Sequence, residues 1–258
     1  MAQFQGKGLP LSETALRQVC DTLPVAVAEL WAVVTVETRG FGFLASRRPL
    51  ILFERHIFHD RTGGKYDKTA PNLSNATPGG YAGGTAEYPR LEAAIVLDRH
   101  AALESASWGL GQIMGFNHAS AGFATVEEMV TAMTNDEKAQ LQGVAGFIKS
   151  NALDAAIRRH DWAAFAKVYN GAAFKKNEYD TRLAAAHAKA AALLPNLRFR
   201  AAQAALLYLG MDPGPVDGLP GRYTRSALVK FQETRHLPVT GGLDAATEAR
   251  LNAEAFPD

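Results

Sequence analysis

The segment that decides the fold runs from Val25 to Glu37 and has the sequence VAVAELWAVVTVE. It is shorter than the roughly 20 residues that span a bilayer and is interrupted by Glu29, so it predicts a buried core helix and no membrane anchor. Gly40 and Gly42 follow directly and are expected to end the helix. Glu37 therefore stands where an apolar helix meets a glycine-rich turn.

A glutamate in this position has a physical reason to keep its proton. Burial among apolar side chains penalises the carboxylate and raises the pKa of a glutamate above its ordinary value of about 4.3. A carboxyl that stays protonated near neutral pH can donate that proton in catalysis. We therefore take Glu37 as the first candidate catalytic acid, the alternative being a solvent-facing glutamate at a helix end.

The first 195 residues are predicted to be mainly α-helical around a small β region. Alanine-rich segments with helical spacing of apolar residues dominate after residue 90, and Thr125 with Glu128 forms a capping-box pattern. Residues 49–53 form a short apolar run suited to a strand, and residues 62–84 are rich in Gly, Pro, Asn and Thr. A loop of this length inside a compact domain is usually functional.

An internal repeat marks the C-terminal part of the chain. The run Pro215-Val216-Asp217-Gly218 recurs 23 positions later as Pro238-Val239-Thr240-Gly241. Each copy predicts a glycine turn followed by an amphipathic helix, and the segment 199–209 supplies a third helix. Because Pro195-Asn196 ends the preceding helix, we predict two domains, residues 1–195 and 196–258.

Composition limits the possible partners and cofactors. The formal net charge is +1, from 27 basic and 26 acidic residues, which gives no general attraction to nucleic acid or to acidic membranes. The single cysteine, Cys20, excludes an intramolecular disulfide or a thiolate metal cluster. Residues 1–8 lack the apolar stretch of a secretory signal, so we expect synthesis to end in the cytoplasm.

The C-terminal repeat carries the first resemblance to a known family. The run 210–218, with Thr224, Phe231-Gln232 and the run 237–241, resembles the peptidoglycan-binding module found on many cell-wall hydrolases. The resemblance covers nearly all of residues 196–258 and implies peptidoglycan as a partner. Within the module, Asp217-Gly218 and Gly241 are interpreted as turn formers, with ligand contact as the alternative.

Four motifs in the first domain carry a second resemblance. They are the runs 37–43, 52–58 and 105–115 and the triplet Tyr169-Asn170-Gly171. Together they resemble the phage-type N-acetylmuramidase family, which is similar to goose-type lysozymes and lytic transglycosylases. The resemblance implies a lysozyme-like, α-rich domain that cleaves the β-1,4 bond between N-acetylmuramic acid and N-acetylglucosamine, with no cofactor and no metal.

The same resemblance implies a place of action. A phage endolysin of this kind accumulates in the host cytoplasm and reaches the cell wall once the inner membrane is permeabilised. We expect a monomer with no stable membrane association.

The resemblance also implies a set of substrate-binding residues. They are Gln112, Tyr169, Asn170 and Trp108. The amide of Gln112 can donate and accept at an N-acetyl group, and Tyr169 or Trp108 can offer a flat apolar face. Gly109 and Gly111 are expected to let the backbone approach a sugar ring. A place in the core is an equally open alternative for Trp108.

Two further glutamates matter for the assignment of catalytic roles. Glu54 is the best second carboxylate, because it follows the predicted strand, which would carry it across the cleft from Glu37; a salt bridge with Arg55 or another basic residue is an equally open alternative. Glu104 is a rival for the acid, since a Glu-Ser pair marks the catalytic glutamate of lytic transglycosylases. Here Glu104 directly adjoins the glycine-glutamine stretch, which favours Glu37.

The sequence also allows three other interpretations. His56, His59 and Asp60 could form a metal site, but we expect them to support the cleft by hydrogen bonds. A lytic transglycosylase would use the muramic 6-hydroxyl in place of water and form 1,6-anhydro ends. A wall-binding protein with an inactive lysozyme-like domain is the non-enzymatic alternative.

Overall fold

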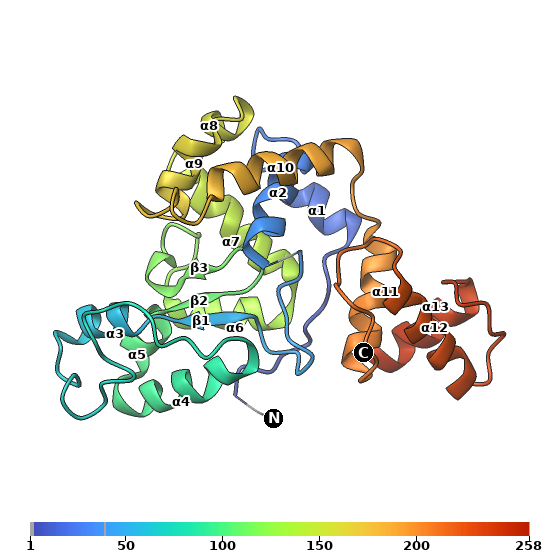
Figure 1. Ribbon diagram of the computed structural model, residues 1–258, viewed down its shortest axis with the longest axis horizontal. Coiled ribbons are helices and arrows are strands. Elements are labelled where there is room, and N and C mark those ends of the chain that lie inside the picture. The colour runs from blue at the N-terminus through green and yellow to red at the C-terminus, as the bar shows by residue number, and fades with distance from the viewer. Residues whose placement is uncertain (1–2, 39, 258) are drawn as a thin grey trace.

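The computed structural model describes residues 3–38 and 40–257, which are mainly helical (Figure 1). The helices before residue 197 are α1 (Glu13–Cys20), α2 (Val27–Thr38), α3 (Arg55–Thr62), α4 (Glu87–Leu97), α5 (Arg99–Glu104), α6 (Val126–Asn135), α7 (Glu137–Ser150), α8 (Asp154–Arg158), α9 (Trp162–Tyr169) and α10 (Tyr179–Ala192). The strands are β1 (Ile51–Phe53), β2 (Ala106–Trp108) and β3 (Ile113–Met114). The remaining helices are α11 (Leu197–Tyr208), α12 (Arg222–Thr234) and α13 (Ala245–Ala255).

Helix α2 is the central helix of the larger, N-terminal part. The side chains of Leu30, Ala32, Val33 and Val34 have no exposed surface. A helix that is apolar on all sides is stable only when protein surrounds it, and α10 packs along its length (Figure 1). The predicted core helix is therefore confirmed.

A small antiparallel sheet in the order β1-β2-β3 forms the β region. Ile51 pairs with Trp108 and Phe53 pairs with Ala106, and all four side chains are buried. The period of two along a strand leaves Leu52 and Glu54 on the opposite, half-buried face. The predicted strand is confirmed, although it is shorter than the apolar run suggested.

The segment after β1 differs in part from the prediction. Residues 55–62 form helix α3, which was not expected in a region of strands and loops. Gly63 ends this helix in the left-handed conformation with φ of 60°, as glycine commonly does. Residues 63–83 contain no helix or strand, as predicted for the long loop. Within residues 3–38 and 40–257, no helix has the length and apolar character needed to cross a membrane.

The C-terminal helices have a core of their own. Helices α11, α12 and α13 pack around buried side chains that include Leu206, Leu228, Phe231 and Leu251. The predicted three-helix unit is confirmed. Its bounds of 196–258 as an independent domain stay a prediction, because one small cluster, with Phe41 and Phe43 on one side and Ala204 and Val216 on the other, joins the two parts.

The sequence repeat has a structural counterpart in two buried glutamines. Gln203 accepts a hydrogen bond from the backbone N–H of Gly218 at 2.7 Å and donates to the hydroxyl of Thr224 at 3.1 Å. The second copy repeats both bonds with Gln232, Gly241 and Thr247, at 2.8 Å and 3.0 Å. These bonds support the interpretation of both glycines as turn formers.

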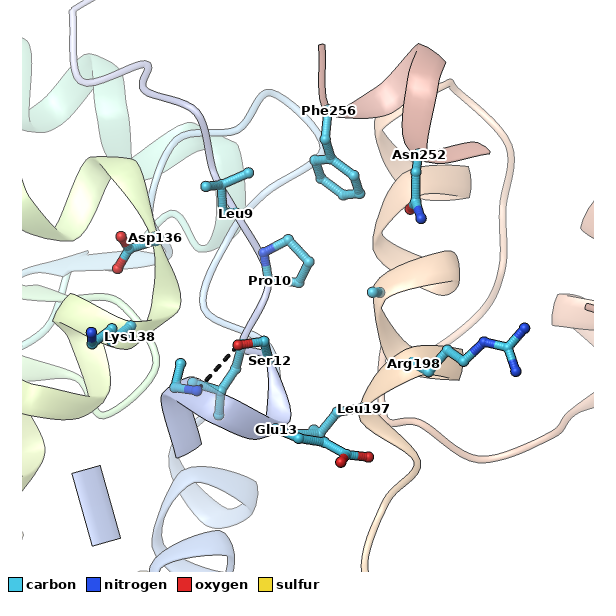
Figure 2. Close-up of a pocket in the computed structure, with 13 residues that line it drawn as sticks. Leu9, Pro10, Ser12, Glu13, Asp136, Lys138, Leu197, Arg198, Asn252 and Phe256 are labelled. Carbon is cyan, nitrogen blue, oxygen red and sulfur yellow. Dashed lines mark hydrogen bonds between the residues drawn. The ribbon is translucent and has the colours of Figure 1, made fainter. Parts of the chain in front are cut away.

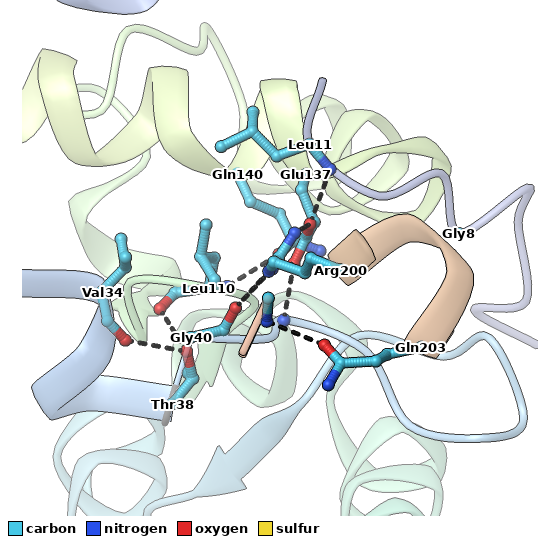
Figure 3. A network of polar contacts seen from close by, with 12 residues as sticks. Gly8, Leu11, Val34, Thr38, Gly40, Leu110, Glu137, Gln140, Arg200 and Gln203 are labelled. Atoms are coloured by element: carbon cyan, nitrogen blue, oxygen red, sulfur yellow. Dashed lines mark hydrogen bonds and ion pairs between the residues drawn. The ribbon is translucent and has the colours of Figure 1, made fainter. Parts of the chain in front are cut away.

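A buried polar network crosses the junction between the two parts (Figure 3). The guanidinium of Arg200 on α11 binds both carboxylate oxygens of Glu137 on α7 and the carbonyl oxygen of Gly40. The Glu137 carboxylate also accepts from the backbone N–H groups of Gly42 at 2.9 Å and Leu11 at 2.7 Å. The charge of each buried side chain is therefore compensated across the junction.

A pocket of about 700 Å³ lies beside this network at the junction (Figure 2). Its walls come from the segment before α1, from the start of α7 and from α11 and α13. They include Leu9, Pro10, Leu197, Arg198, Asn252 and Phe256. Glu37 is not among its lining residues. The pocket is thus a feature of the domain junction and not of the candidate acid.

Candidate active site

Glu37 lies in the last turn of α2, and the next residue fixes that end of the helix. The Thr38 hydroxyl donates to the carbonyl oxygens of Val34 at 3.1 Å and Leu110 at 2.9 Å. Because Leu110 belongs to the turn between β2 and β3, this bond attaches the end of α2 to the sheet. Gly40 then takes a φ of 89°, which favours glycine and directs the chain away from the helix.

The surroundings of Glu37 favour its protonated form. Burial is the largest effect and raises the pKa of Glu37 to about 7. Two smaller effects act in the opposite direction: Asn170 Nδ2 donates to Glu37 Oε1 at 2.7 Å, and the positive charge of Arg182 lies nearby. A glutamate with a pKa near 7 holds its proton in a large fraction of molecules at neutral pH, as a general acid requires.

Helix α10 contributes a cation to the site that the sequence did not point to. Arg182 donates from Nη2 to the carbonyl oxygen of Val36 at 2.9 Å, and its guanidinium lies 5.1 Å from the ring centre of Tyr179. Arg182 stands three residues after Tyr179, so both point from one face of α10. That spacing was the available signal, but an arginine on an amphipathic helix is usually a solvated side chain.

Two tyrosines near the acid remain protonated. Burial raises the pKa of the phenol of Tyr169 well above its usual value, and burial likewise raises that of Tyr179; the charge of Glu37 adds to both shifts. The Tyr169 hydroxyl donates to the carbonyl oxygen of Gly111 at 2.8 Å. The structure therefore brings Tyr169 and Asn170 together with Glu37, as expected for residues of one site.

Gln112 lies in the turn between β2 and β3, next to Gly111, and its amide is engaged within the protein. Its Oε1 accepts from the Ser107 hydroxyl at 2.8 Å, and its Nε2 donates to the carbonyl oxygens of Gly109 at 2.9 Å and Leu50 at 3.2 Å. Gln112 has a left-handed φ of 49°, which is uncommon for this residue type. In this arrangement the amide holds the β2–β3 turn against β1.

The glycines of this turn serve packing. A Cβ at Gly109 would lie 2.7 Å from Gln140 Cγ, and one at Gly111 would overlap Val144 and lie 2.9 Å from the Tyr169 hydroxyl. The expectation that these glycines open the backbone to a sugar ring is therefore wrong. They allow helices α7 and α9 to approach the turn.

Trp108 is not a substrate-binding residue. Its side chain has no exposed surface, and its indole N–H donates to the carbonyl oxygen of Leu103 at 3.1 Å. Phe4 packs on the ring with 5.4 Å between centroids. The prediction of a sugar-facing Trp108 is wrong, and the alternative of a core tryptophan holds. Successive residues of a strand point alternately to the core and to the cleft, and the sequence did not show which side Trp108 faces.

Glu54 lies beyond the carboxyl end of β1 on the same face of the sheet as Leu52. Its Oε2 accepts from the Tyr81 hydroxyl at 2.9 Å, and His56 Nδ1 lies 3.2 Å from the same oxygen. Arg55 instead donates to the carbonyl oxygen of Thr77 at 2.8 Å, so the basic residue beside Glu54 is His56. Tyr81 comes from the long loop, so that loop does supply a residue to the site region.

The strand register separates Glu54 from the residues around Glu37. Before β1, the backbone carbonyl oxygen of Leu50 accepts a hydrogen bond from the side chain of Gln112. After β1, at the other end of its pairing with β2, the backbone N–H of Glu54 donates to the carbonyl oxygen of Ser105. Four residues of extended chain correspond to about 13 Å. The structure thus places Glu54 on the sheet face shared with Gln112, but farther along it.

Glu104 is held in ion pairs with residues of α3 and α5. Its carboxylate lies 3.3 Å from Arg61 and 3.6 Å from His100. The histidines of α3 also have separate partners: His59 Nδ1 lies 2.8 Å from Asp67, while His56 faces Glu54. These contacts give Glu104 and His59 structural roles around α3.

Comparison with known proteins finds a separate family match for each of the two parts of the chain. The family model for N-acetylmuramidase matches residues 26–191, and a model for a peptidoglycan binding domain matches residues 197–251. The crystal structure of Burkholderia AP3 phage endolysin is similar to this chain, with a TM-score of 0.64 and 39% sequence identity over 70% of this chain and 71% of that one. No curated protein matches the chain at a significant level.

The fold and these matches define the class of protein, which is a glycoside hydrolase with a lysozyme-like fold. Within that class, the chain belongs to the N-acetylmuramidase family. It is a peptidoglycan hydrolase that carries a C-terminal peptidoglycan-binding module, and peptidoglycan is its substrate.

Proposed function

We propose that Glu37 is the general acid that protonates the oxygen between N-acetylmuramic acid and N-acetylglucosamine. The observation that supports this most is the pKa of about 7, raised by burial at the end of α2. Asn170 binds Oε1 of the carboxyl and so orients the group, which leaves Oε2 for the leaving oxygen. Protonation of that oxygen is the step that makes it a leaving group.

We propose that Glu54 positions the attacking water or stabilises the sugar cation. Tyr81 fixes the carboxylate through a hydrogen bond, and burial raises the pKa of Tyr81 to about 12, so the phenol remains a donor. A carboxylate with one oxygen held can direct the other toward a water molecule.

Asn170 and Tyr169 are proposed to contact the substrate, with Gln112 shaping the turn beside them. In the described part of the chain, the buried Oδ1 of Asn170 has no hydrogen-bond partner. A buried acceptor without a partner is costly, so a donor from the substrate would complete its bonding. An N-acetyl N–H or a sugar hydroxyl has the required chemistry.

The biological setting is proposed from the similarity to the AP3 phage endolysin. The chain would be synthesised in a host cytoplasm and lyse the cell wall after the inner membrane is permeabilised. It would act as a monomer, with no nucleic-acid partner and no stable membrane association. The nearly neutral charge of +1 is consistent with the last two statements.

Product analysis tests the proposed reaction. Purified sacculi digested with the full chain should yield muropeptides with reducing N-acetylmuramic acid ends, identified by mass and by borohydride reduction. Glu37→Gln should lower lysis and product formation by about a hundredfold or more while it still binds sacculi. Products with only 1,6-anhydro ends would overturn hydrolysis, and an active Glu37→Gln variant would overturn the acid assignment.

A further inference from the structure

Three potential metal ligands meet at the end of α2 opposite Glu37. They are Glu29 in the first turn of α2, His160 in the turn between α8 and α9, and His187 on α10. One ligand atom from each lies within 4.8 Å of the others. From this arrangement we propose that Glu29, His160 and His187 form a structural site for a zinc-type transition-metal ion.

Glu29 is already oriented for this role. Its Oε2 accepts from the backbone N–H of Ala26 at 2.7 Å, and its Oε1 lies 3.0 Å from His160 Nε2. The carboxylate is buried, so its direction is set by the protein and not by solvent. Metal ligands are commonly held in this way by a bond to the atom that does not face the ion.

The two histidine rings lie close to each other beside the carboxylate, with 42° between their planes. His160 has a left-handed φ of 53°, and its ring stacks on Trp162 with 5.6 Å between centroids and 8° between planes. The His187 ring centre lies 4.2 Å from that of His160. Two imidazolium ions at this distance would repel each other, whereas two neutral imidazoles can share one cation.

The donor set selects the kind of ion. Two imidazoles and one carboxylate suit zinc and similar transition metals, while magnesium and calcium prefer oxygen ligands alone. The side chain of His160 is 46% exposed, so water has access to the fourth coordination position.

The site would connect three elements around the catalytic helix. Glu29 and Glu37 are eight residues apart on α2, which corresponds to about 12 Å. Helix α10 carries both His187 and Arg182, the cation near Glu37. A bound ion would therefore fix α10 against α2 without touching the reacting groups, and its effect would appear in stability before it appears in chemistry.

Metal titration of the full chain tests the proposal. Untagged protein is treated with a chelator, dialysed and titrated with zinc chloride by calorimetry, and cobalt chloride is used for absorption spectra. We expect one ion for each chain, cobalt d–d bands of a low-coordinate site, and a higher Tm with zinc. The double variant His160→Asn/His187→Asn should lose more than about a hundredfold in affinity.

A matched control removes two other histidines, with His100→Ala and His236→Asn. Asparagine tolerates the left-handed φ of His160 and His236, so the backbone is little disturbed. The control should keep the wild-type titration and spectrum. Zinc binding that is equally tight in wild type and in His160→Asn/His187→Asn would overturn the site, as would an absence of binding to wild type. If the double variant fails to fold, Glu29→Gln replaces it, with the same outcomes.

Discussion

The Arg200 guanidinium and the Glu137 carboxylate are joined by two hydrogen bonds of 2.6 Å, and neither side chain is exposed to solvent (Figure 3). Arg200 belongs to the binding module and Glu137 to the catalytic part. The same two groups bind the backbone of Gly40 and Gly42, three and five residues after Glu37. One ion pair thus connects the module to the chain segment that follows the acid.

Loss of Arg200 should destabilise the protein strongly, because it would leave the Glu137 carboxylate buried without a cation. We expect Arg200→Met to lower the free energy of unfolding by about 3 to 5 kcal/mol, measured by urea denaturation. Adding Glu137→Gln should recover part of the loss. As a control, Arg99→Met breaks an exposed pair with Glu127 and should cost less than about 1 kcal/mol. Equal losses of unfolding free energy in Arg200→Met and Arg99→Met would show that the buried pair stabilises the protein no more than the exposed pair does.

Removal of the module should reduce catalysis as well as wall binding. A chain that ends at residue 195 loses Arg200, uncovers Phe41 and Phe43, and frees the Gly40 carbonyl from its partner. A simple tether changes only the local concentration of enzyme at the wall. We therefore expect lower kcat on short soluble glycan fragments, where tethering cannot help, and partial recovery of stability with Glu137→Gln. Unchanged kcat on soluble fragments would mean that the module acts only as a tether.

Glu37→Gln should separate the catalytic role of the acid from its effect on stability. Activity should fall by about a hundredfold or more. Because the folded-state pKa of Glu37 is raised from 4.5 to about 7, the folded protein binds this proton more tightly, and stability is lost as pH rises through that range. The variant should therefore match wild type at low pH and exceed it by up to about 3 kcal/mol at high pH. Glu13→Gln, at an exposed site, should show no such trend.

The sequence predicted the features that depend on local pattern. The apolar helix that carries Glu37, the strand at β1 and the three-helix module were all found. The family resemblance, not local pattern, pointed to Tyr169 and Asn170, and Asn170 contacts Glu37. Features that depend on which face of an element turns inward were not predictable. Trp108 went to the core, and Arg182 reached the acid from a helix whose partner the sequence does not name.

The junction between the parts was also beyond the sequence. Arg200 lies in a helix whose pattern resembles that of an ordinary exposed face, and nothing in the spacing of Glu137 marks it as its partner. Two residues 63 positions apart meet only in the tertiary structure. A buried ion pair of this kind is decided by tertiary packing, which overrides the expectation that charged side chains stay in water.

Removing the positive charge of Arg182 should shift the pH dependence of catalysis. Since the acid must be protonated, kcat/KM should fall as pH rises through about 7. Arg182 lowers the pKa of Glu37, so Arg182→Met should raise it and move the falling limb to higher pH. Lys189→Met removes a positive charge elsewhere on α10 and should leave the limb in place. A limb unmoved by Arg182→Met would mean that another group controls it.

Glu54→Gln should mainly lower activity, whereas Glu104→Gln should mainly lower thermal stability. Glu54 is held by Tyr81 beside the sheet face of Gln112, so its loss should lower kcat with little effect on Tm. Glu104 is buried and lies 3.3 Å from the exposed Arg61, so its loss should lower Tm while kcat at a permissive temperature stays close to wild type. Azide, a small nucleophile, should restore turnover to Glu54→Gln if that carboxylate acts on water, and it should not affect Glu104→Gln. A large loss of kcat in Glu104→Gln at unchanged Tm would instead return Glu104 to the catalytic site.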